Sequence, residues 1–142
     1  VSQFDNLLGQ WLGYPSTTCV HQPTCGQSLV TEANGDVYAC DHFVYPEYKV
    51  GNLTQQPLTE IVLSNKQQQF GLEKSQKLTA LCRRCEFRKL CYGGCPKHRF
   101  ISLENEPNPH NYLCASYRYF FEQTAPYMQA MARQIRLHPS AA

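Results

Sequence analysis

Eight cysteines carry most of the chemistry that this chain of 142 residues could perform. Their spacing is irregular, and the densest stretch lies between residues 82 and 95; they are Cys19, Cys25, Cys40, Cys82, Cys85, Cys91, Cys95 and Cys114. Cysteines at this density form disulfides in exported proteins, bind zinc, or hold iron–sulfur clusters. The spacing must decide which of these three the chain uses.

Disulfides are the least favoured of the three. Residues 1–10 contain no basic stretch followed by an apolar one, so no secretory signal is visible. The pair Cys82 and Cys85 forms a Cys-x2-Cys unit, which outside the secretory pathway is typical of metal binding. We therefore expect a metal-binding protein in the cytoplasm.

Zinc and iron–sulfur clusters make different demands on spacing. Structural zinc sites usually combine two Cys-x2-Cys units, or one unit with two histidines three to five residues apart. This chain has one such unit and no such histidine pair; we expect its histidines at the surface or around the ligands, and they are His21, His42, His98, His110 and His138. A four-iron cluster is wider than a zinc ion, so distant cysteines can reach its corners. The spacing favours clusters, and zinc remains the alternative.

The end of the dense stretch supports this interpretation. Cys91-x3-Cys95-Pro96 matches the end of the bacterial ferredoxin motif, whose last cysteine binds the other cluster. Six basic residues surround the stretch, namely Arg83, Arg84, Arg88, Lys89, Lys97 and Arg99. They either form a solvated face or compensate the negative charge of thiolate-bound clusters, and the sequence leaves both possibilities open.

Composition excludes several functions. The net charge of +2 is too small for a binder of nucleic acid driven by phosphate neutralisation, so we expect no nucleic-acid partner. No apolar run approaches the length that crosses a bilayer, so we expect no membrane partner. One domain of modest size must account for the function.

The elements around the first cysteines can be predicted from periodicity. Apolar residues at helical spacing predict a packed helix over residues 3–12. Asn34-Gly35 between β-prone runs predicts a β-hairpin over residues 28–40, ending at Cys40. Residues 43–53 are expected to be extended, with Pro46 outside any central strand.

The second half reads as helical. We expect one helix from Pro57 to about Phe70 with a solvated polar face at residues 66–69, and no continuous helix over residues 81–99. The final helix should begin near Tyr112 and be kinked or divided by Pro126. The fold class is therefore α+β.

With these motifs in place, the sequence resembles a known family, the SPASM domain of radical S-adenosylmethionine enzymes. The family pattern is Cys-x9-15-Gly-x4-Cys, then Cys-x2-Cys-x5-Cys-x3-Cys, then a last cysteine, and this chain satisfies every element from Cys25-x9-Gly35-x4-Cys40 to Cys114. Within the family it is most similar to anaerobic sulfatase-maturating enzymes, through Cys40-Asp41, residues 49–52 and Cys91-x-Gly-Gly-Cys95.

The resemblance implies two auxiliary [4Fe-4S] clusters. The first set of ligands would be Cys19, Cys25, Cys40 and Cys95, and the second set Cys82, Cys85, Cys91 and Cys114. It also implies that Asp41 is the base that deprotonates the substrate side chain, whereas a lone aspartate would ordinarily cap a turn.

The same resemblance sets the expected domain organisation. The motif that binds the S-adenosylmethionine cluster is missing, so we expect residues 1–18 to end an upstream barrel and residues 19–142 to form the SPASM domain. Its parts would be a hairpin region (19–56), a second-cluster region (57–111) and C-terminal helices (112–137). The barrel would carry a third [4Fe-4S] cluster and S-adenosylmethionine, and this chain alone would be inactive.

The implied reaction is oxidation of a sulfatase Cys or Ser to formylglycine, with flavodoxin or ferredoxin as electron donor. The alternatives are a SPASM domain that serves another peptide substrate and a zinc-binding interaction module.

Overall fold

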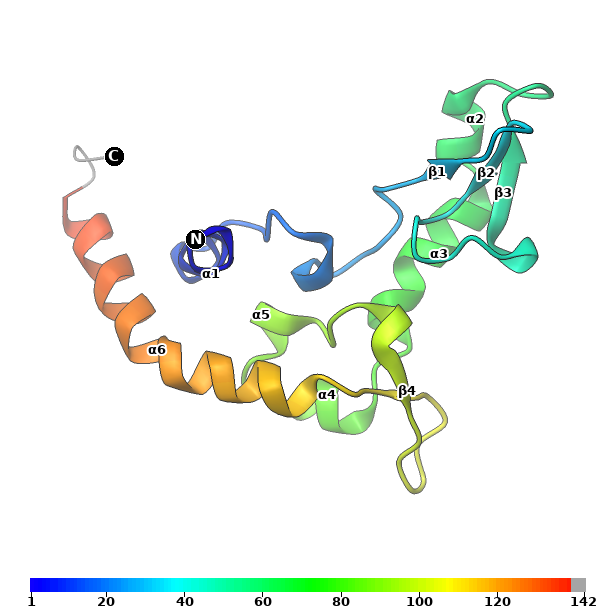
Figure 1. Cartoon of the computed structure of the whole chain (residues 1–142). Helices are drawn as coiled ribbons and strands as arrows, with labels where there is room; N and C mark the ends of the chain where they lie inside the picture. The colour runs from blue at the N-terminus through cyan, green and yellow to red at the C-terminus, as the bar shows by residue number, and fades with distance from the viewer. Residues whose placement is uncertain (139–142) are drawn as a thin grey trace. The chain divides into compact units, whose positions relative to one another are not determined.

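The computed structural model describes residues 1–138 of the chain (Figure 1). The last four residues of the expected SPASM range, 139–142, lie outside the described residues. The chain divides into two compact units. We call residues 1–22 together with the chain from Thr79 onward the cavity unit, and Pro23–Leu78 the hairpin unit. No helix within residues 1–138 has the length and apolar character needed to cross a membrane.

The cavity unit is mainly helical and has one short β-ribbon. Its elements are α1 (Ser2–Leu12), the 3-10 turn η1 (Cys19–His21), α4 (Ala80–Arg84), α5 (Arg88–Cys91), the 3-10 turn η3 (Pro96–His98), β4 (Arg99–Ile101), β5 (His110–Asn111) and α6 (Cys114–Leu137). Strands β4 and β5 are antiparallel, with Arg99 opposite Asn111. The dense cysteine stretch is therefore no continuous helix, as expected, although the break between α4 and α5 falls at residues 85–87, before the glycines and the proline on which the expectation rested.

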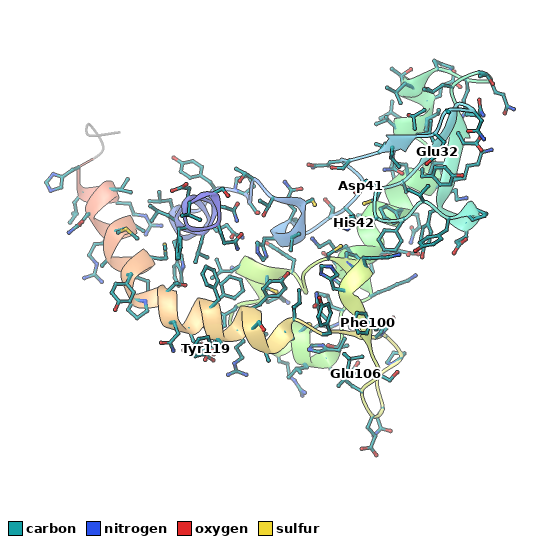
Figure 2. All side chains as sticks on the ribbon, in the orientation of Figure 1. Glu32, Asp41, His42, Phe100, Glu106 and Tyr119 are labelled. Atoms are coloured by element: carbon teal, nitrogen blue, oxygen red, sulfur yellow. The ribbon has the colours of Figure 1, made fainter. Side chains whose placement is uncertain are left out.

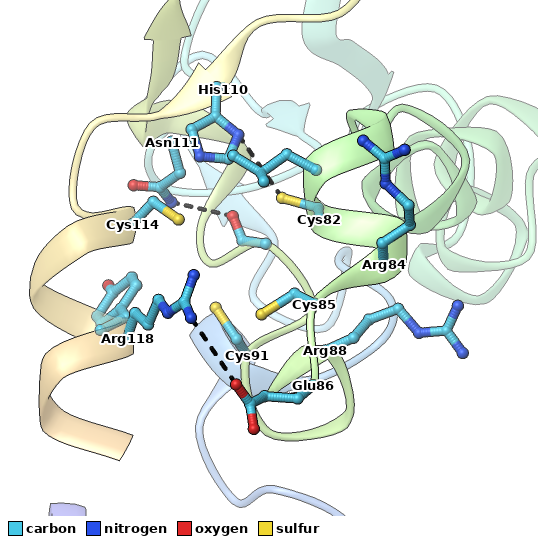
Figure 3. A pocket seen from close by; sticks show the side chains of 13 residues that line it. Cys82, Arg84, Cys85, Glu86, Arg88, Cys91, His110, Asn111, Cys114 and Arg118 are labelled. Atoms are coloured by element: carbon cyan, nitrogen blue, oxygen red, sulfur yellow. Dashed lines mark hydrogen bonds and ion pairs between the residues drawn. The ribbon is translucent and has the colours of Figure 1, made fainter. Parts of the chain in front are cut away.

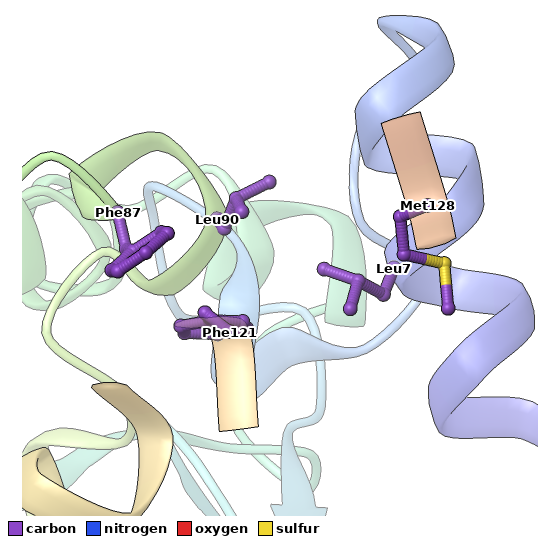
Figure 4. Close-up of a cluster of buried hydrophobic side chains, with 5 residues drawn as sticks. All are labelled: Leu7, Phe87, Leu90, Phe121 and Met128. Carbon is purple, nitrogen blue, oxygen red and sulfur yellow. The ribbon is translucent and has the colours of Figure 1, made fainter. Parts of the chain in front are cut away.

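Helices α1 and α6 share the core of this unit with α5 (Figure 4). The buried residues are Leu7, Phe87, Leu90, Phe121 and Met128. The predicted helix over residues 3–12 is confirmed, although its apolar face is only partly buried, because Phe4 stays 43% exposed at the edge against Phe120.

Pro126 does not divide the last helix. Residues Cys114–Leu137 form one α-helix that bends about midway (Figure 1), as expected where proline removes a backbone hydrogen bond. Phe121 and Met128, on either side of Pro126, are both buried in the core that α6 shares with α1. This packing favours a bent helix over a broken one.

The hairpin unit contains a three-stranded antiparallel sheet and two helices. Its elements are β1 (Val30–Thr31), β2 (Asp36–Tyr38), the 3-10 turn η2 (Pro46–Tyr48), β3 (Lys49–Asn52), α2 (Leu58–Val62) and α3 (Asn65–Gln76). The predicted hairpin is confirmed, with Gly35 in the left-handed region at φ 85° between β1 and β2. Strand β3 adds an edge, and the core is formed by Val37, Ala39, Val50 and Ile61. The observed fold is α+β.

The helix expected from Pro57 to about Phe70 is instead two helices. Ser64 ends the first by capping the second, because its hydroxyl accepts a hydrogen bond from the Gln67 backbone N–H at 3.2 Å. The expectation that residues 66–69 form a solvated face is also wrong for one residue, Gln67. Gln67 is only 4% exposed, because its side chain reaches the carbonyls of Gly26 and Ala39, which neighbour Cys25 and Cys40.

Candidate metal centre

Four cysteines of the cavity unit surround one cavity of about 250 Å³ (Figure 3). They come from three helices and are Cys82 in α4, Cys85 directly after it, Cys91 at the end of α5 and Cys114 at the start of α6. A water molecule occupies about 30 Å³ of the liquid, so this space is much larger than a single metal ion needs. The four residues are the second set that the resemblance implies.

Strand β5 positions both ends of this cysteine set. His110 Nδ1 lies 3.1 Å from the hydroxyl of Thr79, which caps α4 by accepting from the Cys82 N–H, and 3.7 Å from Cys82 Sγ. The next residue, Asn111, accepts from the Leu113 N–H at 2.8 Å, one residue before Cys114. Two buried polar residues thus connect α4 to the start of α6.

Ionisation of the four thiols is unfavourable, because the thiolates would be partly buried and would repel one another. The pKa of Cys91 is raised to about 11, mainly by burial, with a contribution from the neighbouring Cys82 and Cys114. Burial also raises the pKa of Cys114, with Cys82 and Cys85 contributing. Four ionised sulfurs around this cavity would need a cationic centre between them. The donor set therefore fits a cationic metal centre that takes four thiolates.

A single zinc ion fits this geometry less well. Within residues 1–138, no group of three or more Cys, His, Asp or Glu side chains is close enough together to hold one metal ion. The four cysteines line a cavity instead of converging on a point. That arrangement suits a multi-atom cluster, whose corners reach outward to separate ligands.

Basic residues lie around the cavity. Arg84 and Arg88 line it, as two of the six basic residues noted in the sequence, and so does Arg118 of α6. Arg118 pairs with Glu122 at 2.7 Å and with Glu86 at 3.8 Å. Sequence reasoning missed Arg118, although its position one helical turn after Cys114 was a usable signal.

In the hairpin unit, α3 holds the segments that carry Cys25 and Cys40. The side-chain amide of Gln67 donates to the carbonyl of Gly26 at 2.8 Å and to that of Ala39 at 3.2 Å. One turn further on, the carbonyl of Gly71 accepts from the Cys25 N–H at 3.1 Å. The pKa of Cys40 is raised to about 12, mainly by burial, and Asp41 and Cys25 account for part of the rise.

The remaining two cysteines of the first set belong to the cavity unit. Cys19 begins η1 and is exposed, whereas Cys95 precedes η3 and is 7% exposed. Because the first set is divided between the two units, its shared ligation stays a prediction.

Asp41 lies at the surface directly after Cys40 (Figure 2). Its carboxylate accepts a hydrogen bond from Cys40 Sγ at 3.2 Å, and this bond is the main reason that the pKa of Asp41 is lowered. A lowered pKa keeps the carboxylate ionised at neutral pH, and it also makes the carboxylate a weaker base. The role of Asp41 as a base stays a prediction.

Not all histidines lie where we expected them, at the surface or around the cysteine ligands. His21 is 3% exposed and lies edge-on to Tyr117 and Phe121, so it belongs to the interior. The position of His21, two residues after Cys19, gave no sign of this burial, because its aromatic neighbours are about a hundred residues away in sequence. His110 does lie beside a cysteine, while His42 and His138 are exposed.

A sequence model of the SPASM family, described as an iron–sulfur cluster-binding domain, matches residues 19–86. Over these residues the chain belongs to the SPASM family. The matched residues include five of the eight cysteines, and the relatives and solved structures below extend the similarity over more than nine-tenths of the chain.

The similar proteins are sulfatase-maturating enzymes. The serine-type anaerobic sulfatase-maturating enzyme of Bacteroides thetaiotaomicron is 44% identical over 133 residues, which are 93% of this chain and 32% of that protein. The cysteine-type enzyme of Clostridium perfringens (strain 13 / Type A) is 35% identical over 136 residues, which are 96% of this chain and 36% of that protein.

Solved structures agree. "Native anSMEcpe with bound AdoMet and Kp18Cys peptide" matches with a TM-score of 0.78 and 35% identity, over 94% of this chain and 36% of that one. "Native anSMEcpe with bound AdoMet" matches with a TM-score of 0.76 and 35% identity, over 94% of this chain and 36% of that one. The SPASM chain thus spans about a third of the length of these relatives.

Proposed function

We propose that this SPASM chain is the auxiliary-cluster domain of an anaerobic sulfatase-maturating enzyme, a radical S-adenosylmethionine enzyme that oxidises a sulfatase Cys or Ser to formylglycine. The observation that carries the proposal is the cavity lined by Cys82, Cys85, Cys91 and Cys114. Similarity to both serine-type and cysteine-type maturating enzymes supports the reaction.

Two [4Fe-4S] clusters are proposed, one on each set of cysteines. When bound, such clusters supply one-electron transfer at potentials set by their surroundings. In the cavity unit, the four thiols of the second set are half-buried, and three arginines are among the residues that line their cavity. Helix α6 begins at Cys114, and the helix dipole favours a thiolate at this N-terminal position.

Asp41 is the proposed base. It would take the proton from the substrate thiol or hydroxyl, while S-adenosylmethionine and a third [4Fe-4S] cluster would lie in a barrel preceding residue 19. A sulfatase polypeptide and a flavodoxin or ferredoxin are the proposed partners, in the cytoplasm. The exposure of the Asp41 side chain and its position directly after Cys40 support this role.

Metal analysis of variants tests the cluster assignment. After anaerobic reconstitution with iron and sulfide, Cys85→Ala and Cys114→Ala should each lose the same cluster, and Cys40→Ala and Cys95→Ala should each lose the other. If Cys95→Ala instead abolishes the cluster that Cys85→Ala abolishes, the two sets are wrong. Colourless protein that holds about two zinc ions and no iron would replace the proposal with a zinc-binding interaction module.

A further inference from the structure

The loop between Cys91 and Cys95 has an unusual backbone. Its three residues, Tyr92, Gly93 and Gly94, all adopt left-handed conformations, with φ of 48°, 73° and 63°. A residue with a Cβ costs roughly 1–2 kcal/mol in this region, so Tyr92 must be held there by other contacts. The loop connects a cysteine of the second set to one of the first set.

Arg99 supplies those contacts. Its Nη2 donates to the carbonyls of Tyr92 at 3.0 Å and Gly94 at 3.3 Å, and its Nε donates to the carbonyl of Gly93 at 3.2 Å. Asn111, which pairs with Arg99 across the β4–β5 ribbon, donates a further bond to the Gly93 carbonyl at 3.0 Å. All three carbonyls of the loop therefore accept hydrogen bonds from one guanidinium.

The opposite edges of the same peptide groups face Cys91. The Gly94 N–H donates to the Cys91 carbonyl at 2.9 Å, and the N–H groups of both Gly93 and Gly94 act on the Cys91 sulfur, where they lower the pKa of the thiol against the larger effect of burial. The Gly93 N–H shares a peptide group with the Tyr92 carbonyl, and the Gly94 N–H shares one with the Gly93 carbonyl. A carbonyl that accepts a bond from a cation polarises its peptide group and makes the N–H a stronger donor.

Hydrogen bonds to the sulfurs of an iron–sulfur cluster are among the factors that set its reduction potential. A donor draws negative charge from the sulfur and so stabilises the reduced state, which carries one more electron. We infer that Arg99 is a positioning residue that raises the reduction potential of the cluster on the second set, by fixing and polarising the two peptide groups that donate to Cys91. This inference rests on the proposed function, because it requires a cluster in the cavity.

Arg99→Lys tests the inference, because lysine keeps the positive charge and loses the planar set of donors. The matched control is Arg88→Lys. Arg88 lines the same cavity, but its guanidinium donates to the Arg83 carbonyl at 3.5 Å, outside the loop. Each protein is reconstituted anaerobically with iron and sulfide and titrated potentiometrically with detection by electron paramagnetic resonance. The signal that disappears in Cys114→Ala identifies the cavity cluster.

We expect Arg99→Lys to make reduction of the cavity cluster about tenfold less favourable, a shift of about 59 mV to lower potential, at unchanged iron content. Arg88→Lys should leave the potential unchanged. An unchanged potential in Arg99→Lys, or an equal shift in Arg88→Lys, overturns the inference. If the lysine variant does not fold, Arg99→Gln keeps one amide donor and should shift the potential in the same direction, and no shift there also overturns it. Wild-type protein without iron would refute the proposed function instead.

Discussion

The contacts of Gln67 give a quantitative prediction about the hairpin unit. Gln67→Leu keeps a side chain of similar length and removes the amide that donates to the carbonyls of Gly26 and Ala39. Gln67 is 4% exposed, so solvent does not readily replace the lost donor. A buried acceptor left without a partner costs about 1–3 kcal/mol. The Gln67 Oε1 atom is buried without a hydrogen-bond partner, so its removal relieves part of the cost. We therefore expect a net destabilisation of about 1–3 kcal/mol.

Native-state hydrogen exchange measures this effect locally. The Ala39 N–H donates to the Tyr48 carbonyl at 3.0 Å and reports opening of the segment that carries Cys40. A loss of 1–3 kcal/mol should accelerate its exchange about 5- to 160-fold. The control is Gln69→Leu on the exposed side of the same helix, where the Gln69 amide donates to Gln76 at 3.3 Å and the change should stay within about 0.5 kcal/mol. Equal protection in the two variants would refute this account of Gln67.

Three further predictions concern other positions. Gly71→Ala should destabilise the chain by about 1–3 kcal/mol in urea unfolding, because the new Cβ would lie 2.8 Å from the Cys25 carbonyl oxygen, whereas Gly9→Ala, with nothing within 4 Å, should stabilise it by about 0.5–1 kcal/mol. In the full enzyme, Asp41→Asn should slow formylglycine formation by about 10²–10⁴-fold at unchanged cluster content, and full turnover would leave Asp41 a structural residue. In the metal-free chain, the folded state keeps the proton of Cys91, with its pKa of about 11, where the unfolded state releases it near 9.0. The free energy of unfolding should therefore fall as pH rises from about 9 to about 11, and a flat urea midpoint over that range would contradict this.

Local signals predicted much of this fold. Asn34-Gly35 located the hairpin, helical spacing located α1, and glycine and proline predicted that the dense cysteine stretch is no continuous helix. These features depend on a few neighbouring residues, which a single sequence displays. The grouping of four cysteines around one cavity agrees with the set that the family pattern implies, although ligation itself stays a prediction.

The features that sequence reasoning missed depend on residues far apart. The burial of Gln67 follows from two carbonyls 28 and 41 residues away, and the burial of His21 follows from rings on α6. The bonds of Arg99 to loop carbonyls depend on the exact turn of a loop whose first residue, Tyr92, has an unfavourable conformation for its type. A run of polar or basic letters cannot distinguish these residues from a solvated face.

The cavity unit is built from two stretches of sequence that lie far apart, residues 1–22 and the chain from Thr79 onward, and this has a consequence for synthesis of the protein. Leu7 in α1 packs in one core with Phe121 and Met128, which are translated about 120 residues later. At about 5–20 residues per second, α1 waits roughly 6–24 s on the ribosome for its partners. The hairpin unit is continuous in sequence and needs no such delay. During that interval the apolar face of α1 around Leu7 lacks the α6 residues that bury it, so it stays accessible to solvent and to chaperones.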